Sequence, residues 1–152
     1  MLADLLALFQ GGSRHAALRP DNARLALAAL MVRVARSDDD FSAEERGAIL
    51  RELMRRHALP RAEASALLAE AERAEAIAPD TVRFTRLLKD AVAYEDRIDV
   101  IEALWRIVLA DGVRAADEDA LMRQIAPLLG VMDRDSGLAR QRASDAVASD
   151  ID

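Results

Sequence analysis

Apolar residues recur at three- and four-residue spacing along most of this chain, and that pattern constrains its fold more than any other feature. The first long example begins at Pro20, which suits the first turn of a helix, and continues to about Arg36. Comparable stretches follow, each beginning at or near one of these residues: Ser42, Pro60, Asp80, Glu95 and Ala116. No segment alternates between apolar and polar residues for long enough to predict a strand. The sequence therefore predicts an all-α fold, a compact single-domain bundle of about seven to eight helices.

The two ends of the chain differ from this middle part. Residues 1–19 are expected to form a short N-terminal helix and a loop, and residues 20–132 the helical domain itself. Residues 133–152 are predicted to form a C-terminal tail that is weakly helical over roughly 136–147, with Leu138 among its few apolar anchors.

Large apolar side chains on the predicted helix faces are expected to form the core. Trp105 belongs to this group, because it lies on an apolar helical face. The methionines are flexible and suit gaps in a core, so these are assigned to it as well: Met31, Met54, Met122 and Met132.

The chain is acidic and contains no cysteine. Its 152 residues include 27 Asp and Glu against 21 Lys and Arg, a formal net charge of -6, so its overall field repels phosphate backbones. The basic residues are scattered among acids rather than gathered beside aromatic residues, which argues against a nucleic-acid partner. The absence of Cys excludes disulfides and thiolate metal sites. Cations are therefore the favoured charged partners.

Nothing in the sequence predicts insertion into a membrane. The longest uncharged run near the middle, Leu25–Val32, is far shorter than the roughly 20 residues that a membrane span needs. The first residues carry Asp4 and no basic residue before it, unlike a secretory signal. We therefore expect a cytoplasmic protein without a membrane span.

An acidic turn occurs twice in the chain. The stretches ARSDDDFSAEE and VLADGVRAADE each end an apolar helical run, and each places a Glu seven residues after its first Asp. A shift of 73 residues superposes Asp38 on Asp111 and Glu45 on Glu118. The likeness decays beyond the turns, so the repeat is local.

Two explanations of these turns are open. In the first, Ser42 and Glu45 form a capping box, and the other acids stabilise helix N-termini by about 0.3–1 kcal/mol each. In the second, the carboxylates hold a cation, and a set of oxygens without Cys or a nearby His favours Ca²⁺ or Mg²⁺ over Zn²⁺. An EF-hand is excluded, because counting Asp38 as the first loop position puts Ile49 where a bidentate Glu is required.

These turns, together with the stretch FTRLLKD that begins at Phe84, resemble the tellurite-resistance TerB-like family, whose usual signature is Ala-x-Ala-Asp-Gly, a short turn and then Glu. The likeness covers about Asp21 to Val131. The second copy keeps Ala-Asp-Gly at 110–112, whereas the first has Asp39 in place of the family's Gly. The resemblance implies a compact bundle of about seven helices, a divalent-metal site near the acidic turns, and a link to stress responses such as tellurite resistance.

The expected metal ligands are the acids that the two turns share and one that only the first turn has: Asp38, Asp40, Glu45, Asp111 and Glu118. The three in the first turn are expected to supply most of the oxygens. The two in the second turn either complete one shared site or form a poorer second one. A divalent metal, Ca²⁺ or Mg²⁺, is the one cofactor that the sequence predicts.

No catalytic constellation is predicted. His15 and His57 are expected at the solvated surface and neither has a positioned nucleophile nearby, so we do not expect an enzyme. Two function classes are open. One is a non-enzymatic module that binds a divalent cation at the acidic turns. The other is a helical protein-protein interaction module whose acidic surface docks a basic protein partner without any metal. The oligomeric state is not predicted.

Overall fold

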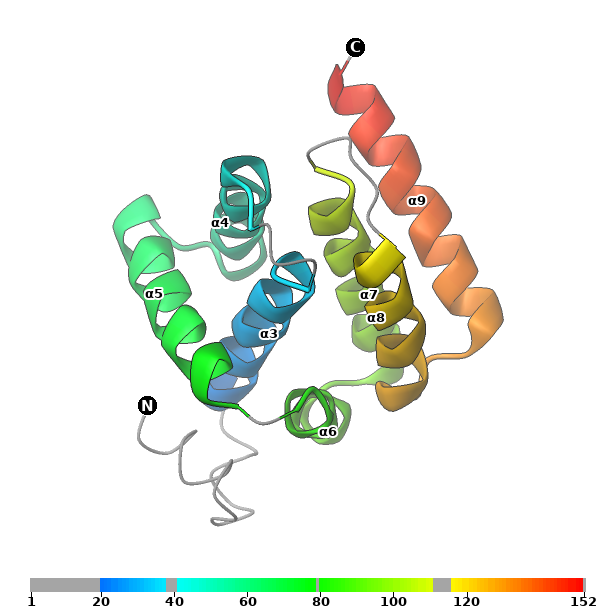
Figure 1. Cartoon of the computed structure of the whole chain (residues 1–152), viewed down its shortest axis with the longest axis horizontal. Helices are drawn as coiled ribbons and strands as arrows, with labels where there is room; N and C mark the ends of the chain where they lie inside the picture. Colours follow the sequence, from blue (N-terminus) through cyan, green and yellow to red (C-terminus); the bar gives the residue numbers. More distant parts are fainter. Residues whose placement is uncertain (1–19, 38–40, 79, 111–115, 152) are drawn as a thin grey trace.

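The computed structural model describes residues 20–37, 41–78, 80–110 and 116–151, without the side chains of residues 20–22, 116–118 and 149–151. The described residues form seven helices and no strand, which confirms the all-α prediction (Figure 1). The helices are α3 Pro20–Ala35, α4 Ala43–His57, α5 Arg61–Ile77, α6 Val82–Ala91, α7 Tyr94–Val108, α8 Ala116–Leu128 and α9 Asp133–Ile151. The predicted N-terminal helix and His15 lie outside the described residues.

Helix α3 is the central element of the fold. Its residues Leu25–Val32 are buried without interruption, none of them more than 4% exposed. The sequence predicted one apolar face, but α3 contacts α4, α5, α6, α7 and α8, so every face of it is covered. Three of the eight residues are alanines, whose small side chains let the neighbouring helices approach closely. The core is therefore built around the helix that leads into the first acidic turn.

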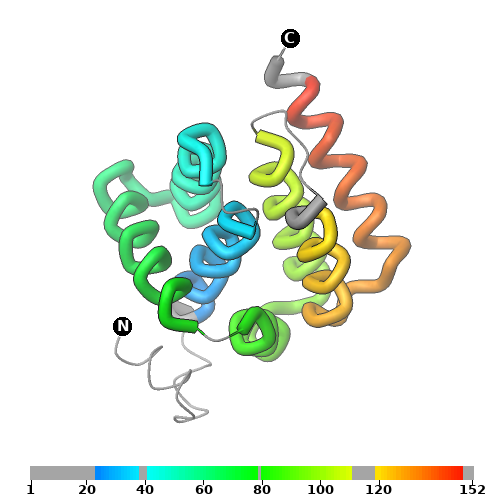
Figure 2. The backbone as a smooth tube through the Cα atoms, viewed as in Figure 1, coloured from blue at the N-terminus to red at the C-terminus, as the bar shows by residue number. Residues whose placement is uncertain are grey.

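The other helices are arranged in two groups around α3. Helices α4 and α5 lie on one side of it and α7, α8 and α9 on the other, while α6 lies across one end between the groups (Figure 2). Phe84 and Leu88 of α6 are fully or almost fully buried and close that end of the core. The predicted core residue Trp105 is buried on α7, which confirms its assignment.

Local sequence signals explain several helix ends. Helix α4 begins with the predicted capping box and ends at Ala58, which adopts a left-handed conformation with φ 51°. After α8, Gly130 has φ 70°, and a Cβ at this position would lie 2.9 Å from Nη1 of Arg97. The positive φ angles of Ala58 and Gly130 turn the chain at the ends of α4 and α8. At position 130 both the positive φ and the close approach of Arg97 favour glycine.

The C-terminal segment differs from its prediction. Instead of a weak helix over 136–147, the structure has the 19-residue helix α9, which packs more extensively against α7 than any other two helices pack together. The expected anchor Leu138 is 49% exposed, so that prediction was wrong. Ala139 and Ala143 are the buried residues of α9, and Arg140 lies over the Trp105 ring at 4.8 Å from its centroid.

One smaller prediction about the core also needs correction. Met132 is 63% exposed, because it follows the end of α8 and faces away from the core, whereas Met31 and Met122 are buried as predicted. Glu75 of α5 is partly buried, and Nε of Arg33 donates to its carboxylate at 3.3 Å, so this contact joins α5 to α3.

Candidate functional site

The two acidic turns connect corresponding pairs of helices. The first turn joins α3 to α4, and the second joins α7 to α8. Helices α3 and α7 pack against each other, and their C-terminal ends, Ala35 and Val108, point to the same side of the molecule (Figure 1). The local repeat in the sequence therefore corresponds to two helix-turn-helix units whose first helices are neighbours.

Four of the five predicted ligands cannot be compared with the structure. Asp38, Asp40 and Asp111 lie outside the described residues. The backbone of Glu118 belongs to the first turn of α8, but its side chain lies outside the described part. Their assignment as ligands stays a prediction.

Glu45 is the one predicted ligand whose side chain is described, and it is engaged in the capping box. Its amide donates to Oγ of Ser42 at 3.0 Å, and its Oε1 accepts from the Ser42 amide at 3.3 Å and from the Ser42 hydroxyl at 3.2 Å. The residue is 0% exposed. The capping box engages one oxygen of this buried carboxylate and fixes where α4 begins. The assignment of Glu45 as a cation ligand stays a prediction.

The remaining described side chains do not provide a metal site of their own. Across 23–37, 41–78, 80–110 and 119–148, no group of three or more His, Asp or Glu residues is placed to hold a metal ion.

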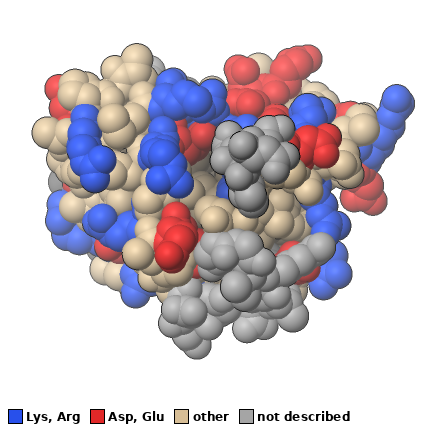
Figure 3. Space-filling view, turned by 90° about the horizontal axis from the view of Figure 1, so that it is seen from above, with Lys and Arg blue, Asp and Glu red and all other residues tan. Residues whose placement is uncertain are grey.

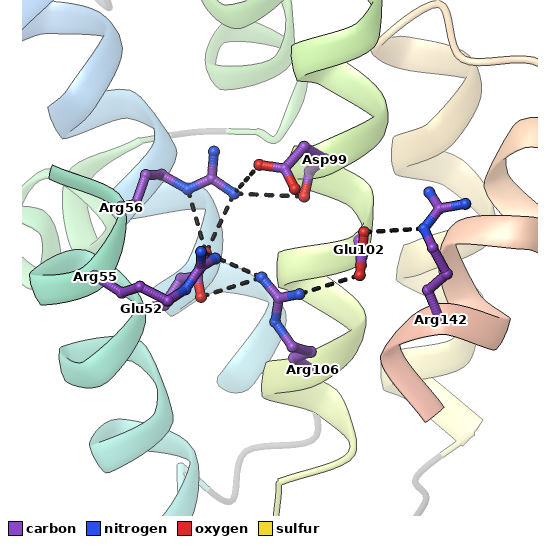
Figure 4. A network of polar contacts seen from close by, with 7 residues as sticks. All are labelled: Glu52, Arg55, Arg56, Asp99, Glu102, Arg106 and Arg142. Atoms are coloured by element: carbon purple, nitrogen blue, oxygen red, sulfur yellow. Dashed lines mark hydrogen bonds and ion pairs between the residues drawn. The ribbon is translucent and has the colours of Figure 1, made fainter. Parts of the chain in front are cut away.

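A network of charged side chains joins the two helix groups at a place that the sequence analysis missed (Figure 4). At its centre is Glu52 of α4, which is 6% exposed. Its carboxylate accepts from Arg55 at 2.8 Å, from Nε of Arg56 at 3.3 Å, and from Nη2 of Arg106 at 3.2 Å through both oxygens. Arg106 belongs to α7, so this contact crosses from one helix-turn-helix unit to the other.

The same network continues across α7 to the C-terminal helix. Arg56 pairs with Asp99 of α7 at 2.8 Å. Arg106 also donates to Glu102 at 3.2 Å, and Glu102 accepts from Nε of Arg142 on α9 at 3.2 Å. The spacing of Glu102 and Arg106 is a helical i, i+4 pair that the sequence displays, but the contacts between helices have no local signal.

The environment of His57 also differs from its prediction. It lies at the C-terminal end of α4 and is half-buried rather than fully solvated. Burial is the main cause that lowers its pKa from 6.5 to about 4, and the neighbouring Arg24 and Arg56 lower it further. His57 is therefore neutral at neutral pH.

The His57 shift predicts a pH dependence of stability. Because the folded pKa of about 4 lies below the ordinary 6.5, the unfolded chain binds the proton more readily between these values. The stabilising contribution is complete above about pH 6.5 and is lost as the pH falls through about 4. We expect urea unfolding to show a smaller loss of stability between neutral and acidic pH for His57→Gln than for wild type. An NMR titration of the His57 ring with a midpoint near 6.5 would contradict this.

The face of the molecule drawn in Figure 3 carries charged side chains of both signs. Lys and Arg side chains alternate there with Asp and Glu side chains (Figure 3). Within the part of the chain that the structure describes, none of the helices has both the length and the apolar character to cross a membrane.

The fold and the paired turns together define the class of protein: an all-α module made of two helix-turn-helix units with a shared core. Residues 24–141 match the family model described as tellurite resistance protein TerB, and the chain belongs to this family. The match confirms the resemblance and extends past Val131 into α9. None of the curated proteins and none of the solved structures matches the chain.

Proposed function

We propose that this TerB-family chain is a non-enzymatic helical module that binds a divalent cation, Ca²⁺ or Mg²⁺, at its two acidic turns. The observation that carries the proposal is the packing of α3 against α7, the two helices that lead into turns of the same spacing. Carboxylate oxygens are among the ligands that these cations prefer, and both turns are rich in Asp and Glu. Membership of the TerB family supports the same function and a role in stress responses such as tellurite resistance.

The described geometry changes the roles proposed for the acidic residues. Asp38 and Asp40 are the proposed ligands of the first turn, and Asp111 and Glu118 those of the second. Glu45 is proposed as a positioning residue, because its carboxylate is already held by Ser42 at the start of α4. A bound cation would reduce the repulsion between the turns and stabilise the folded chain by mass action.

A calcium titration tests this proposal. At a Ca²⁺ concentration about 100 times the Kd, binding stabilises a folded protein by about 2.7 kcal/mol, which for a domain of this size raises Tm by about 5–10 °C. We expect this rise, together with binding heat in calorimetry, for the wild-type chain. The double substitution Asp38→Asn and Asp111→Asn is expected to abolish both effects.

A matched control uses two acids away from the turns. Asp80 and Asp90 are exposed residues before and within α6, and replacing both with Asn removes the same charge as the test variant. This control is expected to keep the full cation response. If neither Ca²⁺, Mg²⁺ nor Mn²⁺ changes the Tm of the wild-type chain, the cation-binding proposal is wrong.

The same variants separate this proposal from the interaction module without a metal. That second function predicts unchanged melting of the Asn variants with and without cations, and weaker, salt-sensitive binding of a basic protein partner. On the face drawn in Figure 3, charges of both signs are interspersed, which gives no specific support to docking through a broad acidic field.

A further inference from the structure

A pocket of about 380 Å³ lies at the end of α3 that is remote from the acidic turns. It is formed where the first turns of α3, the last residues of α4, the end of α6 and the first half of α7 converge. From Arg24, which lines it, to Ala35 at the end of α3 is about 17 Å along the helix axis at 1.5 Å per residue. The pocket therefore belongs to a different part of the molecule from the proposed cation site.

The pocket combines an apolar floor with a polar rim. Leu27, Leu88 and Val100 lie beneath it as part of the core and are no more than 4% exposed. The apolar surface that is open to a ligand therefore belongs to Ala23, Ala91 and Val92. Arg24 and Arg56 stand at its edge. A volume of a few hundred Å³, mostly apolar walls and a few convergent polar groups are typical of sites for small organic molecules.

The two arginines are suited to an anionic group. Arg56 is held in place by Glu52 and Asp99 through its Nε and Nη2, so its position is fixed before any ligand arrives. Arg24 is partly buried and forms no ion pair with any carboxylate among the described residues. A guanidinium group donates in a planar fork that matches a carboxylate.

The neighbouring titratable groups define the charge that a ligand can carry. His57 lines the pocket as a neutral ring, and its Nε2 is enclosed without a hydrogen-bond partner in the described part of the chain. Burial is the largest cause of its lowered pKa, Arg24 and Arg56 lower the pKa further, and Glu52 opposes them. Asp96, which is exposed on the rim, disfavours a second negative charge on the ligand.

We propose that this pocket binds small monocarboxylates with an apolar body, with the carboxylate at Arg24 and Arg56 and the apolar body against Ala23, Ala91 and Val92. The chemistry fits a medium-chain aliphatic acid or an aryl-substituted acid. This proposal does not depend on the proposed cation function, because no residue that lines the pocket belongs to the acidic turns.

Titration of the full chain with octanoate and phenylacetate, followed by two-dimensional NMR, tests this proposal. We expect saturable shifts of the amide signals of residues 23–27, 56–57 and 91–92, with a Kd of about 1 mM or tighter for at least one probe. Octanol, which has the same apolar body without the charge, is expected to bind at least about tenfold more weakly. The dicarboxylate suberate is also expected to bind more weakly, because of Asp96.

Two substitutions sharpen the test. Arg24→Gln is expected to weaken octanoate binding about tenfold or more, whereas Arg73→Gln, which changes an exposed arginine on α5, should leave it unchanged. Asp96→Asn is expected to tighten octanoate binding. The proposal is overturned if neither carboxylate gives saturable shifts at these residues, or if octanol binds as tightly as octanoate. Equal affinity of wild type and Arg24→Gln for octanoate would also overturn it.

Discussion

Replacing Glu52 with Ala is expected to lower the free energy of unfolding by about 3 kcal/mol. The carboxylate of this 6% exposed residue accepts hydrogen bonds from three arginines, and its loss leaves partly buried guanidinium groups without their shared partner. Removing one member of a buried charge cluster costs about 3–5 kcal/mol. The lower end of this range applies here, because Arg56 keeps Asp99 and Arg106 keeps Glu102.

A surface pair on the neighbouring helix provides the control for Glu52. Glu72 of α5 accepts from Arg46 of α4 at 2.8 Å, but the side chain of Arg46 is half exposed. Glu72→Ala is therefore expected to cost less than about 1 kcal/mol. Urea unfolding of both variants measures the difference. Equal losses in the two variants would mean that the network of Figure 4 holds α4 to α7 no more strongly than an exposed ion pair.

Truncation of the central helix is expected to have an effect of similar or greater size. Leu30 of α3 is fully buried in the stretch that all the surrounding helices cover. Leu30→Ala removes buried apolar surface and leaves a cavity that the closely packed alanines beside it cannot fill, so we expect a loss of about 2–5 kcal/mol. The slope of unfolding free energy against urea should not change, because the same surface is exposed on unfolding.

Ile77 at the end of α5 supplies the matched control for this truncation. It is 57% exposed, so Ile77→Ala is expected to change stability by no more than about 0.5 kcal/mol. A loss below about 1 kcal/mol for Leu30→Ala would contradict the assignment of α3 as the central helix, since surface truncations have effects of that size.

The features that could be predicted from the sequence are those that neighbouring residues determine. The capping box depends on two residues three positions apart, so Ser42 and Glu45 identified the start of α4 correctly. Pro20 likewise predicted the start of α3, and the apolar spacing predicted the faces of α5, α6 and α7. Each of these signals lies within a few helical turns.

Burial that depends on several neighbours could not be predicted in the same way. The apolar period of α3 identified one inward face, but the number of helices around it is a property of the whole fold. For α9, the sequence predicted burial of a residue that the structure shows to be exposed. Leu138 is larger and more apolar than Ala139, yet the buried residues of α9 are alanines, because small side chains allow the closest approach of α9 to α7. Alanine is common both in cores and on surfaces, so its burial is hard to predict from sequence.

The same distinction between local and long-range features applies to the candidate site. The acidic turns could be found from sequence because they repeat, and the family match over residues 24–141 confirmed the resemblance of the chain to the TerB family. The network around Glu52 and the pocket beside Arg24 depend on residues from helices far apart in the chain, so no local pattern indicates them. Glu45 shows why residue type alone is insufficient, because the same acid suits a cation ligand or a helix cap. Its hydrogen bonds with Ser42 show the cap, and its role as a ligand stays a prediction.

The most direct test of cation binding at the paired turns is the anomalous difference density of a crystal grown with Mn²⁺, which uses the same oxygen ligands as Ca²⁺ and Mg²⁺. We predict one strong peak between the turn that follows α3 and the turn that follows α7, with oxygens of Asp38, Asp40 or Asp111 as ligands. The crystal of the Asp38→Asn, Asp111→Asn variant should lack this peak. A fully ordered pair of turns with no peak, or a peak only at lattice contacts elsewhere, would contradict the proposed function.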